Sequence, residues 1–278
     1  MTDRRSSAFP LAWRLLWPLR QYLRLSPLER GKGLLTRLFL MPFIPPAPAS
    51  FFAQLPGGAR IALQYRETLG LTTLIHGGFE VAETRRLCAG ARPGTCVIDV
   101  GANVGIFTVS LGSALRTKGT VWACEPLPSN VERLQENLRL NDLNNVDVHP
   151  LALGNRKGEV TFHLSDDPAF HSIVGVAQRR DSGRTVTVKM DRLDNIWHEA
   201  GCPAVSLIKI DVEGAELQVL EGAQELIATN RPELMLEANT PAHLDALAGW
   251  LKPRGYSPCQ PDGFMSWNYL FTPGPNKA

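Results

Sequence analysis

The chain has 278 residues, 44% of them hydrophobic and 20% charged, so it is long enough to bury a sizeable core. These proportions exclude disorder, a collagen-like repeat and a disulfide scaffold as descriptions of the whole chain. The net charge of +2 is unevenly spread, because residues 1–50 carry +6 while the remainder holds 21 basic against 25 acidic side chains, which argues against a uniformly basic nucleic-acid binder.

Residues 1–50 are expected to form an appendage that contains a basic amphipathic helix. Arginines fall on one side of this helix, and the apolar side chains on the other are Leu11, Leu15, Trp17 and Leu19. Two interpretations stay open. Either the apolar side packs on the main domain, or residues 1–40 rest on an anionic membrane surface, to which Trp, Leu and Arg together are suited.

An export signal is the weaker interpretation of the same region. Arg4 and Arg5 precede an apolar stretch, but Arg14 and Arg20 interrupt it and no cleavage site follows. No run of 18 apolar residues occurs, so no membrane-spanning helix is expected. A Pro-rich linker at 42–48 then ends the helical region and places a domain boundary near residue 50.

The remaining elements follow a regular order. Residues 51–92 are expected to hold strands at 60–65 and 71–75 and a helix at 80–88. From residue 93 onward, buried strands alternate with helices, which predicts a parallel sheet covered on both faces. The expected strands are 95–100, 120–124, 146–149, 206–210 and 233–237. The expected helices are 104–115, 129–140, 215–228 and 241–251, the second of them with a capping box formed by Ser129 and Glu132.

Two features depart from this alternation. Extra strands at 159–164 and 185–189 flank a polar loop at 165–184. Strands at 256–260 and 267–271 flank the turn at 261–263, which predicts a closing hairpin with an antiparallel edge strand. The expected fold is therefore α/β and Rossmann-like, a doubly wound and mostly parallel sheet with a C-terminal antiparallel hairpin. The expected domains are 1–50, 51–92 and 93–278.

The run VIDVGANVG at 97–105 is the strongest chemical motif. It predicts a buried strand that ends in Asp99, a glycine turn and the start of a helix. Gly101 and Gly105 let the backbone approach a ligand closely and let the helix pack near the strand. In open parallel sheets the ligand crevice lies beyond the carboxyl ends of the strands, so this turn faces it. Many nucleotide-binding folds have such a turn, so the run is not specific by itself.

Glu125 at the end of the second strand makes the motif more specific. A carboxylate there can accept hydrogen bonds from both hydroxyls of a nucleoside ribose, and the alternative is a surface acid at a strand end. Pro126 restricts the Glu125 backbone to extended conformations. No phosphate-binding P-loop is present, and the Asp99 carboxylate would repel a pyrophosphate. These features favour S-adenosylmethionine over NAD as the ligand.

Four sequence blocks together resemble the FkbM-type methyltransferases. They are VIDVGANVGIFTVSLG, VWACEPLPSNVERLQENLRLND, HPLALGN with GEVTFHL, and SLIKIDVEGAELQVLEGAQELI, and they extend roughly over 80–256. The resemblance implies a class I S-adenosylmethionine-dependent O-methyltransferase of sugar or polyketide hydroxyls. It implies that Glu125 contacts the ribose and that Ala152, which stands where other class I enzymes often have an acid, lies at the adenine. The full set of implied cofactor-binding residues is Asp99, Gly101, Ala102, Asn103, Gly105, Glu125, Ala152 and Asp211.

Candidates for a catalytic base follow the fourth strand and occupy the polar loop. Asp211 and Glu213 are expected to point into the crevice, and His171 lies in the loop. Methyl transfer from a sulfonium disperses charge, so positioning contributes most, and a base that takes the hydroxyl proton adds ~10²–10⁴-fold. Each residue has a structural alternative: Asp211 as a helix cap, Glu213 as an anion at a helix start, and His171 as a surface residue. No metal-ligand spacing is visible, so no metal is expected.

We therefore expect a methyltransferase that converts S-adenosylmethionine to S-adenosylhomocysteine and methylates a hydroxyl of a sugar, glycolipid or related natural product. Five scattered cysteines without a C-x-x-C pair favour a cytoplasmic location, with contact at the inner face of a membrane as an extension. Two rivals remain. One is an NAD-dependent Rossmann oxidoreductase, which the GANVG turn and closing hairpin disfavour. The other is a non-catalytic membrane-associated scaffold with the same fold.

Overall fold

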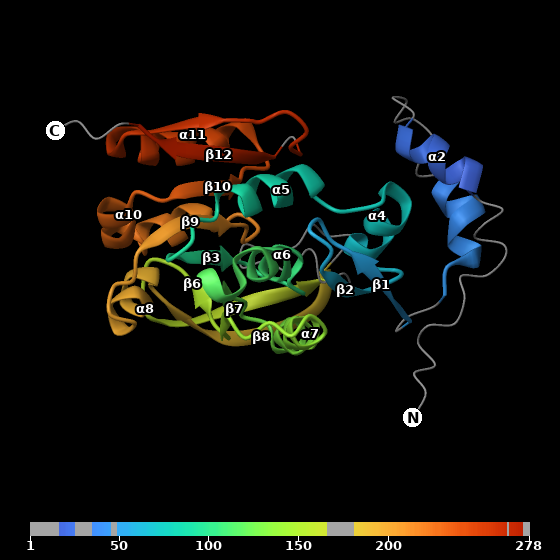
Figure 1. The fold of residues 1–278 in the computed structure, drawn as a ribbon, viewed down its shortest axis with the longest axis horizontal. Helices are drawn as coiled ribbons and strands as arrows, with labels where there is room; N and C mark the ends of the chain where they lie inside the picture. Colours follow the sequence, from blue (N-terminus) through green and yellow to red (C-terminus); the bar gives the residue numbers. More distant parts are fainter. Residues whose placement is uncertain (1–16, 26–34, 46–48, 166–180, 266, 275–278) are drawn as a thin grey trace. The chain divides into compact units, whose positions relative to one another are not determined.

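The computed structural model describes residues 17–25, 35–45, 49–165, 181–265 and 267–274 (Figure 1). The chain divides into two compact units. One consists of residues 1–54 and 61–79, and the other of residues 55–60 and 80–278. The expected domain boundaries near residues 50 and 92 stay predictions.

The first unit contains short helices and a two-stranded sheet. Its elements are α2 (Trp17–Leu25), the π-helix η2 (Thr36–Leu40), the 3-10 helix η3 (Met41–Phe43), β1 (Ser50–Gln54), β2 (Arg60–Gln64) and α4 (Thr68–His76). Helix α2 overlaps the end of the expected amphipathic helix, whereas Leu11 and Leu15 lie outside the described residues, so the helix as a whole stays a prediction. None of the helices formed by the described residues has the length and hydrophobicity needed to traverse a bilayer.

The strand expected at 71–75 is wrong, because these residues belong to α4. An apolar run of this length fits a buried helix segment as well as a strand. In the structure Leu74 and Ile75 are buried as part of a helix that begins at Thr68 and ends before Gly77. Gly77 adopts a left-handed conformation and terminates the helix.

A seven-stranded sheet forms the centre of the second unit, in the order β11-β12-β10-β9-β3-β4-β5. Its strands are β3 (Cys96–Val100), β4 (Thr120–Cys124), β5 (Val146–His149), β9 (Val205–Ile210), β10 (Glu233–Glu237), β11 (Tyr256–Cys259) and β12 (Asn268–Pro273). The central strand β3 runs parallel to both of its neighbours, β4 and β9. Asp99 is thereby placed beside Lys209 in the pairing register.

The closing hairpin is confirmed, but its antiparallel strand is not at the edge as expected. β12 lies between β10 and β11 and is antiparallel to both, so β11 is the edge strand. The burial of the two strands explains this order. Leu270 and Phe271 of β12 are buried in the cores on opposite faces of the sheet, whereas three of the four residues of β11 are exposed.

Helices cover both faces of this sheet, which confirms the doubly wound architecture (Figure 1). On one face α5 (Val81–Gly90) and α6 (Ile106–Leu115) contribute Leu87 and Phe107 to a core with strand residues such as Leu207. On the other face the core is completed by α8 (Leu193–Glu199), α9 (Glu216–Glu221), α10 (Gln224–Asn230) and α11 (Pro241–Leu251).

Two expected helix features differ in the structure. The helix expected at 215–228 is divided into α9 and α10 at Gly222, whose backbone lies so close to the Gly154 carbonyl that a Cβ would come within 1.9 Å of its oxygen. The capping box at Ser129 does not form. Helix α7 (Pro128–Arg139) starts one residue earlier, because Pro128 suits the first helical position, and no side chain caps it.

The extra strands form a separate three-stranded sheet. It consists of β6 (Ala152–Leu153), β7 (Gly158–Ser165) and β8 (Asp181–Asp191), in the order β6-β8-β7. Both strands of the β7–β8 pair are longer than expected, so they include the two ends of the expected polar loop. Residues 166–180 of that loop, with His171, lie outside the described residues.

Candidate active site

Acidic side chains gather where neighbouring strands of the large sheet end. Asp99 lies near the end of β3, Glu125 follows β4, Asp211 follows β9 and Glu237 is the last residue of β10. Because these strands are parallel, their carboxyl ends meet at one edge of the sheet. In open α/β sheets that edge is where ligands bind.

A buried lysine connects two of these acids. Lys209 on β9 places its Nζ 3.0 Å from Asp211 Oδ2 and 3.7 Å from Asp99 Oδ1. The Asp99 Oδ2 atom accepts a 2.5 Å hydrogen bond from the Thr108 hydroxyl on α6. The Lys209 ammonium also lies over the Phe107 ring, 4.5 Å from its centroid. The ends of β3 and β9 and the start of α6 are therefore held by one charged network.

The network determines the charge of its members. Burial works against the charge of Lys209, but the carboxylates of Asp211, Asp99 and Glu80 outweigh it and raise its pKa. Burial raises the pKa of Asp99, while the Lys209 ammonium and the Thr108 hydroxyl act in the opposite direction. Lys209 is thus a fixed positive charge beneath the acids at this edge.

The turn after β3 is fixed by the elements on both sides of it. The backbone N–H groups of Gly101 and Ala102 donate to the Cys124 carbonyl at the end of β4, at 2.9 and 3.1 Å. Gly101 has a φ of +81°, and a Cβ there would lie 1.9 Å from the Asp211 carbonyl oxygen. Gly105 has a φ of +97°, and a Cβ there would lie 2.5 Å from Leu134 Cδ1 on α7. Packing against a backbone carbonyl requires the glycine at Gly101, whereas at Gly105 the positive φ favours glycine, because the Leu134 side chain can shift.

Glu125 is buried and joined to this turn. Its Oε2 accepts a 2.8 Å hydrogen bond from the backbone N–H of Asn103, which has a φ of +50°. Its Oε1 accepts from the Leu127 N–H at 3.0 Å and from the Asn130 side chain at 3.2 Å. Burial raises the pKa of Glu125 to about 7, although these hydrogen bonds lower it. The carboxylate is therefore held in one orientation at the end of β4.

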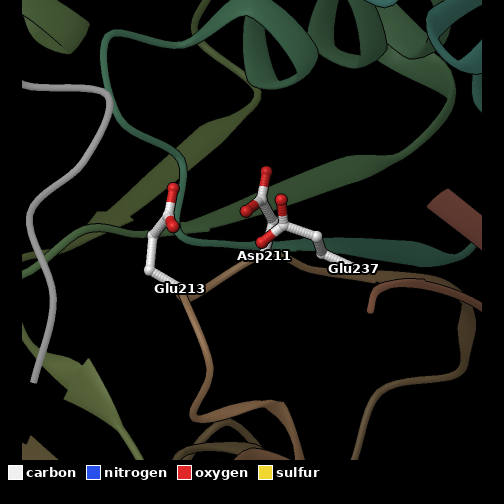
Figure 2. Close-up of side chains that lie close together, drawn as sticks. All are labelled: Asp211, Glu213 and Glu237. Atoms are coloured by element: carbon white, nitrogen blue, oxygen red, sulfur yellow. The ribbon is translucent and has the colours of Figure 1, made fainter. Parts of the chain in front are cut away.

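Three carboxyl groups form a cluster at the ends of β9 and β10. Figure 2 shows Asp211, Glu213 and Glu237, each of which has a carboxylate oxygen within 4.8 Å of those of the other two. Burial and then the carboxylates of Asp211 and Glu213 raise the pKa of Glu237 to about 10, so its side chain is protonated at neutral pH. Oxygen donors at this spacing would suit a hard divalent cation only with Glu237 deprotonated, and the sequence predicts no metal.

A neighbouring acid holds the turn that carries Asp211 and Glu213. Glu216 Oε1 accepts hydrogen bonds from the backbone N–H groups of Val212 (3.0 Å) and Gly214 (3.2 Å), and its Oε2 lies 3.2 Å from His243 Nε2. No side chain caps α9, so Asp211 does not act as the helix cap that was its structural alternative. Glu213 lies three residues before α9, with a φ of +55°, rather than at the helix start.

A further buried acid approaches the network from the start of α5. Glu80 has a φ of +46° and accepts a 2.9 Å hydrogen bond on Oε1 from the side chain of Asn268 on β12. Its Oε2 is buried and has no hydrogen-bond partner among the described residues. Burial, followed by the Asp211 carboxylate, raises the pKa of Glu80 to about 7.

The structure thus brings most of the predicted site residues together. Asn103 and Glu125 are hydrogen-bonded, Gly101 touches Asp211, and Asp211 lies beside Glu213. Ala152 is buried in the core of the small sheet, among residues that include Leu127 and Phe162. The residues that the sequence analysis missed are Glu80, Lys209, Glu216 and Glu237. A charged residue inside the apolar strand SLIKI could have pointed to Lys209.

Comparison with known proteins identifies related chains. Residues 99–258 match the model of the methyltransferase FkbM domain. The 31-O-demethyl-FK506 methyltransferase FkbM of Streptomyces tacrolimicus is 28% identical over 207 residues, which cover 62% of this chain and 75% of that protein. The hexuronic acid methyltransferase AglP of Haloferax volcanii is 32% identical over 126 residues, which cover 45% of this chain and 48% of that protein.

Among solved structures, the methyltransferase FkbM from Methylobacillus flagellatus KT aligns with a TM-score of 0.46 and 21% identity, over 72% of this chain and 52% of that one. The chain spans less than two thirds of the length of several curated relatives, for example 58% and 62% of two of them. The family match nevertheless extends over more than half of the chain and includes every strand end that carries an acid of the site.

Proposed function

The chain belongs to the methyltransferase FkbM family, and from this premise we propose that it is an S-adenosylmethionine-dependent O-methyltransferase. Its sheet has the Rossmann-like class I methyltransferase arrangement, with one antiparallel strand inserted next to the edge. One observation carries the proposal: the residues matched by the family model include all four acids at the carboxyl edge of the sheet, which are Asp99, Glu125, Asp211 and Glu237. The proposed acceptor is a hydroxyl of a sugar, glycolipid or related natural product.

The donor set at the end of β4 fits the cofactor. Glu125 Oε2 accepts one hydrogen bond from the described residues, that of Asn103, and a carboxylate oxygen has room for a second donor such as a ribose hydroxyl. The methionine part of the cofactor would lie against Gly101, Ala102 and Asn103. The adenine would lie beside Ala152. When bound, S-adenosylmethionine supplies an electrophilic methyl group on a sulfonium centre. The residues of this chain have to hold the acceptor in line and receive its proton.

Asp211 is the proposed base. It is partly exposed, and Lys209 holds it through Oδ2, which leaves Oδ1 to accept a hydroxyl proton. Glu237 is protonated at neutral pH and therefore does not serve as a base, but it can donate a hydrogen bond within the cluster. Glu213 lies close enough to share the role, and His171 remains the third candidate. Asp211→Asn is expected to lower kcat by ~10²–10⁴-fold.

The names of relatives support the acceptor class. One is named for a 31-O-demethyl substrate and another for hexuronic acid. Both names describe the relatives, and they favour an oxygen acceptor for this chain. An enzyme that methylates oxygen forms either an ether from a hydroxyl or an ester from a carboxylate, so the product has to be distinguished chemically.

Cofactor binding is tested by a thermal shift assay. S-adenosylmethionine and S-adenosylhomocysteine at 100 times their Kd would each stabilise the protein by about 2.7 kcal/mol. For a domain of this size each kcal/mol raises Tm by roughly 2–4 °C, so the expected Tm shift is several degrees. Glu125→Ala should abolish the shift, whereas the exposed Glu132→Ala should keep it. A shift with NAD alone would favour an oxidoreductase, and no shift with any of them in a folded sample would favour a scaffold.

The acceptor class is tested with S-adenosylmethionine labelled in the methyl group. Neutral hexoses, uronic acids and a glycolipid are incubated with the enzyme, and the labelled products are then treated with alkali. Ethers retain the label and esters lose it. Retained label on a sugar supports hydroxyl methylation, while label lost entirely as methanol would replace it with carboxyl methylation. Asp211→Asn serves as the inactive control.

Contact with a membrane surface is a further part of the proposal. The first 50 residues carry a charge of +6, and large apolar side chains in the same unit are exposed: Tyr22 (44%), Leu38 (56%) and Phe39 (51%). Basic and apolar side chains together favour an anionic bilayer surface, such as the inner face of a cytoplasmic membrane. The Leu38→Ser, Phe39→Ser variant and deletion of 1–48 should both reduce co-sedimentation with anionic vesicles. Unchanged co-sedimentation would leave packing on the main domain as the role of this segment.

A further inference from the structure

A thiol, an imidazole and a carboxylate form a chain of contacts outside the proposed active site. Cys202 Sγ lies 3.3 Å from His198 Nδ1, and His198 Nε2 lies 2.9 Å from Glu225 Oε2. His198 is in the last turn of α8, and Glu225 is in the first turn of α10. Cys202 precedes β9, so the three residues lie near the amino end of that strand. The proposed active site is at its other end.

The backbone around Cys202 fixes the thiol against the imidazole. The Cys202 N–H donates to the Trp197 carbonyl at 2.9 Å, and the Gly201 N–H donates to the His198 carbonyl at 2.9 Å. The indole of the buried Trp197 donates to the Pro203 carbonyl at 2.9 Å, which anchors the same turn on the hydrophobic core. Cys202 has a φ of +57°, so a non-glycine residue occupies a position that favours glycine.

The other cysteines lack this combination. Burial raises the pKa of Cys88 to about 11 and that of Cys96 to about 12, and it also raises the pKa of the fully buried Cys124. These three thiols stay protonated at neutral pH. Cys96 and Cys124 are also buried, and Cys88 is partly buried. Cys259 is exposed like Cys202, but no described side chain makes a hydrogen bond to its sulfur. Cys202 alone among the described cysteines is both exposed and paired with an imidazole.

We propose that Cys202 is a redox modification site that His198 and Glu225 activate toward hydroperoxides. The Cys202 thiol passes its proton to His198 Nδ1, and Glu225 balances the resulting imidazolium charge, as carboxylates do for histidine bases elsewhere. The thiolate sulfur attacks one peroxide oxygen, forming an S–O bond as the O–O bond breaks. The leaving hydroxide, or the alkoxide of an organic hydroperoxide, takes the imidazolium proton and departs as water or an alcohol. Cys202 is oxidised to a sulfenic acid and the peroxide is reduced.

The position of the site suggests a consequence for the fold. A sulfenic acid at Cys202 replaces the S–H beside His198 at the end of α8, a helix whose Leu193 and Trp197 belong to the core on one face of the sheet. Further reaction with a cellular thiol would attach a larger group at the same exposed position. The proposal does not depend on the methyltransferase reaction, because its chemistry uses none of the residues of that site.

The test compares two exposed cysteines within one folded protein. Full-length protein at pH 7 is treated with limiting hydrogen peroxide and a cyclic diketone that traps sulfenic acids, and separately with iodoacetamide. Mass spectrometry then gives the rate at each cysteine. We expect Cys202 to react about tenfold faster than Cys259 with either reagent, since a positioned base assists thiol deprotonation. Equal rates at Cys202 and Cys259 would overturn the proposal.

Variants separate the imidazole from the turn that carries it. His198→Ala should reduce the Cys202 rate to that of Cys259, and His198→Asn should do the same while keeping a polar partner for the sulfur. Glu225→Gln changes an exposed side chain, so it should leave Tm unchanged and slow Cys202 by about two- to threefold. A Cys202 rate that is unaffected in all three variants, with an unchanged Tm, would show that exposure alone sets its reactivity and would overturn the proposal.

Discussion

Lys209 is the residue on which the charges of the site depend. It sits on a central strand whose other side chains are buried, and it contacts both Asp99 and Asp211. A carboxylate as deeply buried as that of Asp99 is unfavourable without a positive partner. Lys209 therefore stabilises the folded state and orients Asp211 for the proposed reaction. It acts as a positioning residue and not as a base, because its pKa is raised.

Lys209→Met should destabilise the protein by about 3–5 kcal/mol, since removal of one partner leaves buried carboxylates without compensation. Chemical denaturation monitored by circular dichroism would measure the loss. Lys189→Met, at an exposed position on β8, controls for the removal of one positive charge. A similarly small effect of both substitutions would contradict the assigned role of Lys209.

Glu80 predicts a specific dependence of stability on pH. Its pKa is raised to about 7 in the folded protein from an ordinary value of 4.5, so between these pH values the folded chain holds a proton that the unfolded chain has released. Its contribution is fully present below pH 4.5 and is lost as the pH rises to about 7. Glu80→Gln is always neutral, and its Tm relative to the wild type should therefore be higher at pH 8 than at pH 5.

Differential scanning calorimetry at the two pH values would measure this difference. Gln retains an acceptor for the Asn268 side chain, so the hydrogen bond to β12 need not be lost. Glu132→Gln, measured in parallel, corrects for the loss of one exposed negative charge. A Tm difference between Glu80→Gln and wild type that is the same at pH 5 and pH 8 would show that Glu80 does not hold a proton in the folded state.

At the scale of elements, the turn between β3 and α6 is set by close packing with the end of β9. Gly101 has a positive φ, and its Cα faces the Asp211 carbonyl with no space for a side chain. The same approach brings the proposed cofactor turn next to the proposed base. Packing between two elements thus places the binding and chemical parts of the site together.

Gly101→Ala should therefore destabilise the protein by more than the ordinary cost of a positive φ, which is about 1–2 kcal/mol. Gly94→Ala provides a matched control, because Gly94 has a φ of +78° and a methyl group there would meet no atom within 4 Å. Thermal unfolding and the shift with S-adenosylhomocysteine would be measured for both. If the two substitutions destabilised the protein equally, backbone strain at positive φ alone would explain the effect of Gly101→Ala, and close packing against Asp211 would not contribute.

Elements were predictable from sequence where pattern and length agree. The buried strands around Ile98 and Ile208 were found because apolar runs of five or six residues end at glycine or acidic turns. The segment 71–75 was mistaken for a strand because a short apolar run has no period of its own. The break at Gly222 depends on the Gly154 carbonyl, 68 positions away in the sequence, so no local pattern could reveal it.

The site was predictable where one strand–turn–helix motif contains it. Asp99, Asn103 and Glu125 belong to adjacent segments, so their meeting followed from parallel strand order. Glu80 and Glu237 reach the site from other elements, and only the tertiary fold brings them near Lys209. Their protonation likewise depends on burial among other carboxylates, which the sequence does not reveal.

At the scale of the whole molecule, the last strand completes the sheet. β12 inserts between β10 and β11 and buries Leu270 and Phe271. Its Asn268 side chain also donates to Glu80 and Glu83, which lie almost 190 positions earlier in the sequence. β12 is therefore part of the core and of the site's surroundings.

Deletion of residues 260–278 should prevent accumulation of folded protein. Without β12, the apolar strand β10 becomes an unprotected edge, and such edges pair with other chains. Recovery in the supernatant after centrifugation and the circular dichroism of that fraction would measure the effect. Deletion of 275–278 alone leaves β12 intact and should be tolerated. Normal recovery of the longer deletion would mean that the sheet is stable without its inserted strand.

The inserted strand also has a consequence for biosynthesis. A ribosome makes β10 and β11 before it makes β12, so β10 has an unpaired edge while the intervening residues are translated. The strands that precede β12 in the sequence can pair as they emerge, but the edge of β10 is paired only when residues 268–273 are released. Synthesis therefore includes a kinetic interval in which the sheet is assembled except for one strand. During this interval, chaperones that bind extended apolar segments would be able to bind the unpaired β10.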